Sequence, residues 1–450
     1  MSAGFDTVLI ANRGEIALRI QRACRALGLR TVAAYAEPDR EAPHVRHADI
    51  ALCIGPAAAQ RSYLDPTAIL LAAEASGAQA IHPGYGFLSE NAGFARSVEE
   101  AGLVFIGPRS ETIALMGDKI TAKRAMRAAG IPCVPGPDTG LPDDPVALHA
   151  LAETIGYPVI AKAAGGGGGR RMRVVAGPEE LDAALAVTRA EAARAFGNPE
   201  VYLEKFLRHP RHVEIQVLAD AHGTALWLGA RDCSLQRRHQ KVLEEAPPPG
   251  IAADAIAAIG ERCAAACRDI GYRGLGTFEF LYEDGAFYFI EMNTRVQVEH
   301  TVTEMVTGLD LVQLQLRVAR GEKLALRQDD IAVQGHAFEC RINAEHPQSF
   351  VASPGRVTGW VQPGGPGIRV DTHMAAGSVV PPYYDSMIAK LIAHGADRSA
   401  ALARLRVALD EMQVEGIHTN LALHRRLVRT DFVAGGGADI HALEQFLASA

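Results

Sequence analysis

Polar and apolar positions alternate most regularly in residues 291 to 300. Every second position carries a polar side chain: Glu291, Asn293, Arg295, Gln297 and Glu299. In an extended strand these side chains share one face, because successive side chains point to opposite sides. An apolar run, Phe287 to Ile290, comes directly before them and is typical of a buried strand. The pattern alone is also compatible with a half-buried strand whose second face is solvated.

The residue types on this face favour a binding site. Carboxylates, amides and a guanidinium occur together without Lys, Ser or Asp, a set suited to a metal ion, a phosphate and a small anion. Fully extended, the segment from Glu291 to Glu299 spans roughly 26 Å, which is too long for one small ligand. We therefore expect the strand to end after Asn293, with Arg295 and Gln297 curling around an anion together with Glu299.

A β-hairpin is predicted just before this stretch, because strand-like runs flank Asp284-Gly285. A two-residue turn places Glu279 opposite Ile290, whereas a three-residue turn places it opposite Glu291. In the second register the two carboxylates repel each other unless a cation lies between them. Mg²⁺ beside a phosphate fits such a pair. The alternative is two unrelated surface glutamates.

The first 110 or so residues alternate between strand and helix patterns. Strands are predicted at 8–11, 31–35, 80–81 and 104–106, and a helix at 16–27 that ends at Gly28. This order predicts a mostly parallel sheet. The glycine fingerprint of dinucleotide-binding folds is absent after the first strand, where Asn12-Arg13-Gly14-Glu15 stands instead. Dinucleotide binding is therefore not supported.

Five prolines between residues 132 and 145 predict a linker, followed by a small αβ segment. Inside that segment, Gly165 to Gly169 lie between strand-like runs at 158–162 and 172–175. They form either a flexible linker or a mobile hairpin whose backbone N–H groups contact a phosphate. Lys162 would supply a point charge. This is no P-loop, because Gly-Lys-Ser/Thr does not follow.

The segment RDCSLQRRHQK, residues 231–241, is rich in cationic side chains. It fits a nucleic-acid patch, a solvated face, or anion binding inside a cleft. The overall acidity of the chain and the lack of interleaved aromatic residues favour the cleft. There, Gln236 and His239 could hydrogen-bond to a sugar.

Two further features carry alternatives. The turn-rich loop HPGYGFLSEN, residues 82–91, lies between a predicted strand and a helix, where α/β sheets form ligand clefts. It also fits a tight turn in which Ser89 caps the helix. Arg341 is a lone arginine in an apolar strand and is either a buried ion-pair partner or an anion clamp.

Composition places the chain among soluble globular proteins of two or three domains, with 450 residues, 48% hydrophobic and 22% charged. A net charge of −7 argues against nucleic acid or anionic membranes as partners. The apolar N-terminal run is too short for a signal peptide or membrane span. Cys263 and Cys267 have helical spacing and are expected to pack in a core, with no zinc site. A reducing cytoplasm is the expected setting.

Together these segments resemble biotin carboxylases, which have the ATP-grasp fold, over essentially the whole chain. The motifs are YPVIAKAAGGGGGRRM, FIEMNTRVQVEH, IANRGEIALRI, HPGYGFLSENA, RDCSLQRRHQKVLEEAP, ECRINAE and PPYYDSMIAKLI. The resemblance implies an α/β ATP-grasp enzyme. Its parts would be an N-terminal Rossmann-like βαβ domain (1–117), a linker helix (118–133), a small glycine-loop lid (134–206) and a larger C-terminal mixed α/β domain (207–450).

The resemblance also implies an activity. MgATP (or the Mn²⁺ complex) and bicarbonate give carboxyphosphate, and its CO₂ passes to biotin on a separate carrier protein. The whole enzyme would be acetyl-CoA carboxylase, with carboxyltransferase subunits as partners and a homodimeric, cytoplasmic carboxylase component. The alternatives are a propionyl-, methylcrotonyl-, pyruvate- or urea-type carboxylase, or a non-catalytic ATP-binding regulator. The chain contains no Met-Lys biotinylation segment, so the carrier and carboxyltransferase are expected on other chains.

Residue roles follow from the same resemblance. The implied nucleotide contacts are Lys119, Lys162, Gly168, Gly169, Glu204, Lys205, Leu207, His212, Gln236 and His239. The implied metal ligands are Glu279, Glu291 and Asn293, of which the two glutamates also face the nucleotide. The implied bicarbonate and biotin contacts are Tyr85, Lys241, Arg295, Gln297, Val298 and Arg341. Glu299 would be the base, and Lys241, Arg295 and Arg341 would complete the catalytic set.

Two positions depart from the family pattern. The glycine loop usually runs Gly-Arg-Gly, whereas this chain reads Gly169-Arg170-Arg171. A side chain at 171 restricts positive φ there, so lid closure or ATP affinity is expected to differ. Ala161 replaces a larger aliphatic residue, which is a small packing change.

Overall fold

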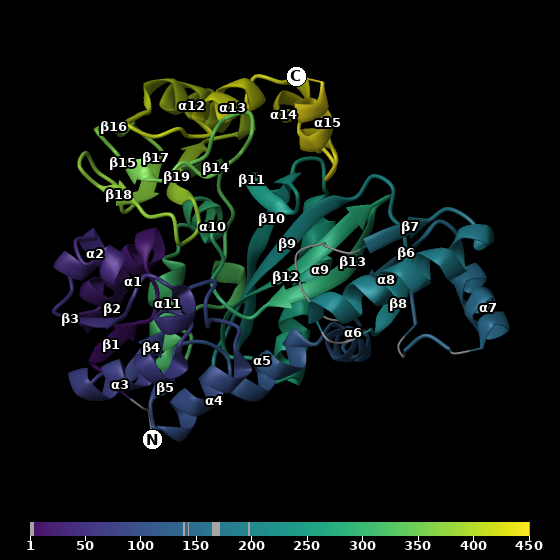
Figure 1. Ribbon diagram of the computed structural model, residues 1–450, viewed down its shortest axis with the longest axis horizontal. Helices are drawn as coiled ribbons and strands as arrows, with labels where there is room; N and C mark the ends of the chain where they lie inside the picture. The colour runs from purple at the N-terminus through teal and green to yellow at the C-terminus, as the bar shows by residue number, and fades with distance from the viewer. Residues whose placement is uncertain (1–3, 138–139, 143, 164–171, 197–198, 450) are drawn as a thin grey trace.

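The computed structural model describes residues 4–137, 140–142, 144–163, 172–196 and 199–449. The glycine run and Arg170-Arg171, and with them the predicted phosphate contacts Gly168 and Gly169, lie outside the described residues. Figure 1 shows an N-terminal parallel sheet, a small sheet beside helices α7 and α8, and a larger sheet between them that continues into the C-terminal part.

The N-terminal sheet has the order β3-β2-β1-β4-β5 and is parallel throughout, which confirms the predicted β-α-β pattern. Its strands are β1 (Thr7–Ile10), β2 (Arg30–Ala36), β3 (Ile50–Gly55), β4 (Ala80–His82) and β5 (Val104–Phe105). The helices around it are α1 (Gly14–Ala26), α2 (Pro43–Arg46), α3 (Pro66–Ser76) and α4 (Ala92–Glu100), with 3-10 turns at Glu37–Asp39 and Ala59–Arg61.

Two local predictions in this part need correction. Strand β3 is absent from the sequence-based prediction although its residues are apolar; it is an edge strand in which exposed and partly buried residues alternate. The cap of α4 is Asn91, whose side chain accepts a hydrogen bond from the Phe94 N–H. Ser89 instead donates its backbone N–H to the Gly86 carbonyl inside the preceding turn, so it does not cap the helix.

Helices α5 (Ser110–Gly117) and α6 (Lys119–Ala128) connect the N-terminal sheet to the small sheet. The small sheet has the order β7-β6-β8 and is antiparallel. It contains β6 (Val159–Ala163), β7 (Met172–Val175) and β8 (Val201–Lys205), packed against α7 (Pro145–Ile155) and α8 (Leu181–Phe196) with a 3-10 turn at Pro178–Glu180. The two strands predicted on either side of the glycines are therefore confirmed.

The larger sheet has eight strands in the order β13-β12-β9-β10-β11-β14-β19-β17, all antiparallel. They are β9 (Arg211–Ala219), β10 (Ala225–Arg237), β11 (Gln240–Ala246), β12 (Gly274–Glu283), β13 (Ala286–Asn293), β14 (His336–Asn343), β17 (Ile368–Thr372) and β19 (Met387–Gly395). Short pairs add β15 (Gly355–Arg356) with β18 (Val379–Val380), and β16 (Gly359–Val361) with β20 (Gln413–Glu415).

Helices cover this sheet and fill its cores. They are α9 (Ala253–Asp269), α10 (His300–Thr307), α11 (Leu311–Ala319), α12 (Arg398–Glu411), α13 (Leu421–Leu427), α14 (Asp431–Gly435) and α15 (Ala442–Ala448), with a 3-10 turn at Gln328–Asp330. Cys263 and Cys267 of α9 are fully buried in the core, as predicted. Among the described helices, none has the length and apolar character needed to cross a bilayer.

The register of the predicted hairpin results from a two-residue turn together with a β-bulge, and neither of the two simple turns alone produces it. Asp284 and Gly285 both have positive φ and form a two-residue turn that pairs Glu283 with Ala286. An irregularity between residues 279 and 280 then shifts the pairing by one residue. Glu279 consequently lies directly opposite Glu291, because the extra residue of the bulge falls in β13.

Four buried histidines predict a loss of stability below about pH 6. Burial lowers the pKa of His44 and His424 to about 4, and that of His82 and His373 to about 3. As the pH falls through the ordinary value, the unfolded chain binds protons that the folded chain does not, so the free energy of unfolding falls. At a pH one unit below the ordinary histidine pKa, each of these histidines lowers the free energy of unfolding by roughly 1.4 kcal/mol. Thermal unfolding should therefore occur several degrees lower at about pH 5.5 than at about pH 7.5; equal melting temperatures would contradict these burial effects.

Candidate active site

A cavity of about 400 Å³ lies between the small sheet and the larger sheet. Most of the predicted site residues line it: Lys119, Lys162, Glu204, His212, Gln236, His239, Lys241, Glu279, Glu291, Asn293, Arg295, Gln297, Val298, Glu299 and Arg341. Two predicted nucleotide contacts are not among its described lining residues. Lys205 points its ammonium at the carbonyls of Gly156 and Tyr157, and Leu207 is buried.

The predicted bend after the strand is confirmed. Strand β13 ends at Asn293, and the chain then leaves the sheet. Arg295 donates to Glu90 Oε2 and to Asn293 Oδ1, both at 2.8 Å. Gln297 donates to Glu279 Oε1 at 2.8 Å. The second half of the alternating stretch therefore folds back onto the first half.

Lys241, near the start of β11, lies at the centre of the site. Its ammonium contacts the carboxylates of Glu214, Glu279 at 3.0 Å and Glu299 at 2.6 Å. Burial opposes the lysine charge, but these carboxylates raise its pKa well above the usual value. Burial alone would raise the pKa of Glu299, but Lys241, assisted by Arg341, lowers it to about 2. Glu299 is therefore ionised at neutral pH.

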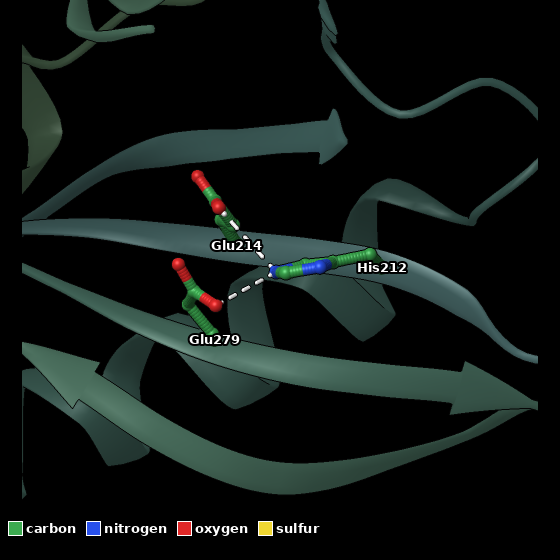
Figure 2. Close-up of side chains that lie close together, drawn as sticks. All are labelled: His212, Glu214 and Glu279. Atoms are coloured by element: carbon green, nitrogen blue, oxygen red, sulfur yellow. Dashed lines mark ion pairs between the residues drawn. The ribbon is translucent and has the colours of Figure 1, made fainter. Parts of the chain in front are cut away.

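Figure 2 shows His212 and Glu214 from β9 beside Glu279 from β12. The His212 Nε2 atom lies 3.4 Å from Glu214 Oε1 and 3.0 Å from Glu279 Oε2. Burial would lower the pKa of His212, but Glu279 and Glu214 raise it to about 9. A protonated imidazole does not bind a metal ion. This trio is thus an ion-paired cluster with a net negative charge, although its three side chains lie close enough to share a cation.

Sequence patterns missed Glu214, which is fully buried and central to the site. It alternates with His212 and Gln216 along β9, the same signal that identified residues 291 to 299. Its second carboxylate oxygen accepts hydrogen bonds from Arg231 at 2.9 and 3.0 Å. Arg231 also donates to Gln297 at 2.6 Å. Arg231 thus holds both Glu214 and Gln297 in place by hydrogen bonds.

The cationic segment 231–241 is therefore divided between separate roles. Its residues form the end of β10, a tight turn with positive φ at Arg238 and His239, and the start of β11. His239 and Lys241 line the cavity, as the cleft interpretation predicted. Arg237 instead lies over the ring of Phe350, 3.5 Å from its centroid. The side chains do not form a common basic face.

The predicted metal ligands fit a divalent cation. Glu279 and Glu291 are direct cross-strand partners, and Asn293 follows on the same strand. Burial and the neighbouring Glu279 raise the pKa of Glu291. A cation between the carboxylates would relieve this repulsion. Carboxylate and amide oxygens are the donors that Mg²⁺ or Mn²⁺ accepts, with the remaining positions left for phosphate and water.

Lysines gather beside these predicted metal ligands, and Lys119 lies 3.6 Å from Glu291. Lys162 of β6 donates to Glu204 Oε2 at 2.7 Å, and Lys123 contacts the same carboxylate. Burial and Lys119 lower the pKa of Lys162 to about 8, and burial and Lys162 lower the pKa of Lys123 well below its usual value. A phosphate would relieve this repulsion between cations. Lys123 was missed in the sequence, although it lies one helical turn after Lys119 in α6.

A second cavity of about 390 Å³ lies between the start of α1, the 82–91 loop and the strand β19. Tyr85, for which a substrate contact was predicted, lines it. Both cavities are lined by the same five residues: Gln240, Lys241, Arg295, Val298 and Arg341. The site is thus two chambers that meet at one group of polar residues.

Arg341 is an ion-pair partner, and its position also leaves the anion-clamp interpretation open. It donates to Glu244 Oε1 at 2.5 Å and to Glu299 Oε2 at 3.0 Å, so it is an ion-pair partner. It also lines both cavities, where its guanidinium can meet an anion. Burial opposes its charge, but Glu244 and Glu299 raise its pKa.

Family comparisons cover nearly the whole chain. The family described as "Biotin carboxylase, N-terminal domain" matches residues 4–113. "Carbamoyl-phosphate synthase L chain, ATP binding domain" matches residues 118–327, and "Biotin carboxylase C-terminal domain" matches residues 339–445.

Individual relatives and solved structures agree with these matches. The biotin carboxylase of Allochromatium vinosum is 61% identical over 99% of this chain and 100% of its own length. A pyruvate carboxylase component of Methanothermobacter thermautotrophicus is 48% identical over 98% of this chain and 90% of its own. The biotin carboxylase complex with β,γ-ATP from Campylobacter jejuni superposes with a TM-score of 0.94 at 44% identity, covering 98% and 99% of the two chains. The biotin carboxylase domain dimer of Hydrogenobacter thermophilus 2-oxoglutarate carboxylase, with MgADP and bicarbonate, gives 0.92 at 45% identity, covering 98% of each.

Proposed function

Since the chain belongs to the biotin carboxylase family, we propose that it carboxylates biotin on a separate carrier protein, using bicarbonate and MgATP. It is an ATP-hydrolysing ligase with the ATP-grasp fold and forms a C–N bond. The observation that carries the proposal is the shared wall of the two cavities. Nucleotide chemistry in one cavity and biotin in the other would meet at Lys241, Arg295, Val298 and Arg341.

Bicarbonate activation is assigned to the curled end of the alternating stretch. Lys241, Arg295 and Gln297 would hold the bicarbonate oxygens, with the backbone of Val298 beside them. Glu299, ionised and 2.6 Å from the Lys241 ammonium, would take the bicarbonate proton. Fixing a weak nucleophile against a base lowers the barrier through positioning and proton transfer.

Phosphoryl transfer is assigned to the first cavity. Lys119, Lys123 and Lys162 would bind the phosphates, while Glu204 orients two of these lysines. Bound at Glu279, Glu291 and Asn293, Mg²⁺ or Mn²⁺ supplies charge compensation for the phosphates. The oxygen of bicarbonate attacks the terminal phosphorus, which releases ADP and gives carboxyphosphate. His212, Gln236 and His239 lie where they can contact the remainder of the nucleotide.

Transfer to biotin is assigned to the second cavity. Carboxyphosphate breaks down to CO₂ and phosphate, the phosphate removes the N1 proton of biotin, and N1 attacks the carbon of CO₂ to form the new C–N bond. Arg341 would stabilise the oxyanion that develops on the ureido group, because a charge-assisted donor is strongest in a water-poor site. Tyr85 lines the same cavity, where it would contact biotin.

The acceptor of the complete enzyme is best assigned as acetyl-CoA. Relatives at 58–61% identity are named biotin carboxylase, whereas the pyruvate carboxylase component is 48% identical. We assign the carrier and carboxyltransferase to partner chains, the oligomer to a homodimer and the location to the cytoplasm. The separate sheets support the boundaries 1–117, 118–133, 134–206 and 207–450.

The test is ADP release with bicarbonate, measured with and without free biotin. The proposal predicts bicarbonate-dependent ATP hydrolysis that biotin stimulates. A rate that biotin leaves unchanged would refute biotin as the acceptor. Replacing bicarbonate with chloride at equal ionic strength is the control for unspecific hydrolysis.

A further inference from the structure

A buried lysine that the proposed mechanism does not use lies behind the shared wall of the two cavities. Lys390, in the middle of β19, is fully buried. It is the direct cross-strand partner of Arg341 on one side and of Asp371 on the other. An ammonium is expensive to bury unless it is hydrogen-bonded and paired, so its contacts indicate what it does.

The contacts of Lys390 lead to two residues that line the second cavity. Its Nζ atom donates to the carbonyl of Val298 at 2.9 Å and lies 3.3 Å from Glu15 Oε1. The same Glu15 oxygen accepts the hydroxyl hydrogen of Tyr85. Val298 and Tyr85 both line the second cavity. One buried ammonium of the larger sheet thus contacts Val298 directly and Tyr85 through Glu15.

Lys390 and Arg341 divide their partners between them. Although they are neighbours across the sheet, Arg341 binds the carboxylates of Glu244 and Glu299, whereas Lys390 binds the Val298 carbonyl. Two consecutive residues, 298 and 299, are therefore held by cations from adjacent strands. Burial opposes the lysine charge, but Glu15 raises the pKa of Lys390, so it stays protonated at neutral pH.

We propose that Lys390 is a positioning residue for carboxyl transfer to biotin. It fixes the Val298 carbonyl and, through Glu15, the hydroxyl of Tyr85. Both groups are thereby held in fixed positions around the ureido ring. The inference rests on the proposed function of the second cavity. It predicts a selective defect, because the lysines that face the nucleotide lie in the first cavity and do not contact this group.

The test is Lys390→Met, which keeps the length of the side chain and removes its charge and hydrogen bonds. We expect the KM for free biotin to rise at least tenfold, with the KM for ATP within twofold of wild type. Equal rises in both KM values would show a merely structural role and overturn the proposal, as would an unchanged KM for biotin.

Asp371→Asn is the matched control, since it removes a charge 4.0 Å from Lys390 but touches neither Val298 nor Glu15. It should lower the melting temperature without changing the KM for biotin. If Lys390→Met does not fold, Glu15→Gln tests the same connection: a rise in the KM for biotin alone supports it, and no rise overturns it. Failure of the wild-type protein to respond to biotin would instead refute the proposed function.

Discussion

Replacing Glu299 with glutamine is expected to reduce biotin carboxylation by about three orders of magnitude while leaving ATP affinity nearly unchanged. The substitution keeps the shape of the side chain but removes the group placed to accept the bicarbonate proton beside Lys241. It leaves the lysines at the phosphate end of the cavity intact. Carboxybiotin formation and nucleotide dissociation constants measure the two halves of this prediction.

A fall in nucleotide affinity of similar size would mean that Glu299 has been assigned to the wrong step. Glu322→Gln serves as the control, because Glu322 is a surface carboxylate whose described ion pairs are with exposed or half-exposed arginines. Its activity should equal that of the unaltered protein.

Glu291→Gln is expected to raise the Mg²⁺ concentration needed for half-maximal bicarbonate-dependent ATP hydrolysis. Outer-shell changes at metal sites cost roughly 10–100-fold in affinity, so a direct ligand should cost at least as much. The effect should be largely confined to the Mg²⁺ requirement, because Glu291 has a single described ion-pair partner, Lys119 at 3.6 Å. A titration with Mg²⁺ measures it, and excess Mg²⁺ should restore part of the rate.

An unchanged Mg²⁺ requirement would remove Glu291 from the metal site. Asp284→Asn is the matched control in the same hairpin. It deletes a carboxylate at the turn of the hairpin but preserves the turn, because asparagine tolerates positive φ at this position. The control should show the Mg²⁺ dependence of the unaltered protein.

The sequence predicted those parts of the site that lie close together along the chain. Alternation identified Glu291, Asn293 and the residues that curl after them, because strand geometry fixes which side chains share a face. The pairing of Glu279 with Glu291 was only one of two alternatives, since a bulge that restores the register leaves no clear sequence signal.

The remaining parts depend on contacts between distant segments. Glu90 binds Arg295 across 205 residues, and Lys390 reaches Val298 across 92. Glu214 lies in a strand buried on both faces, where a polar residue gives no indication of its partners until the sheet is assembled. Local patterns therefore predict the site residues that lie close together in the sequence, whereas contacts between distant segments are seen only in the folded structure.

Following the bicarbonate oxygen through the reaction tests directly whether carboxyphosphate forms in this site. The protein would be incubated with ATP, biotin and bicarbonate carrying an oxygen isotope, and the released phosphate analysed by mass spectrometry. We expect one labelled oxygen in each phosphate, because a bicarbonate oxygen attacks phosphorus and stays there when CO₂ leaves. Unlabelled phosphate from a biotin-stimulated reaction would contradict the proposed mechanism.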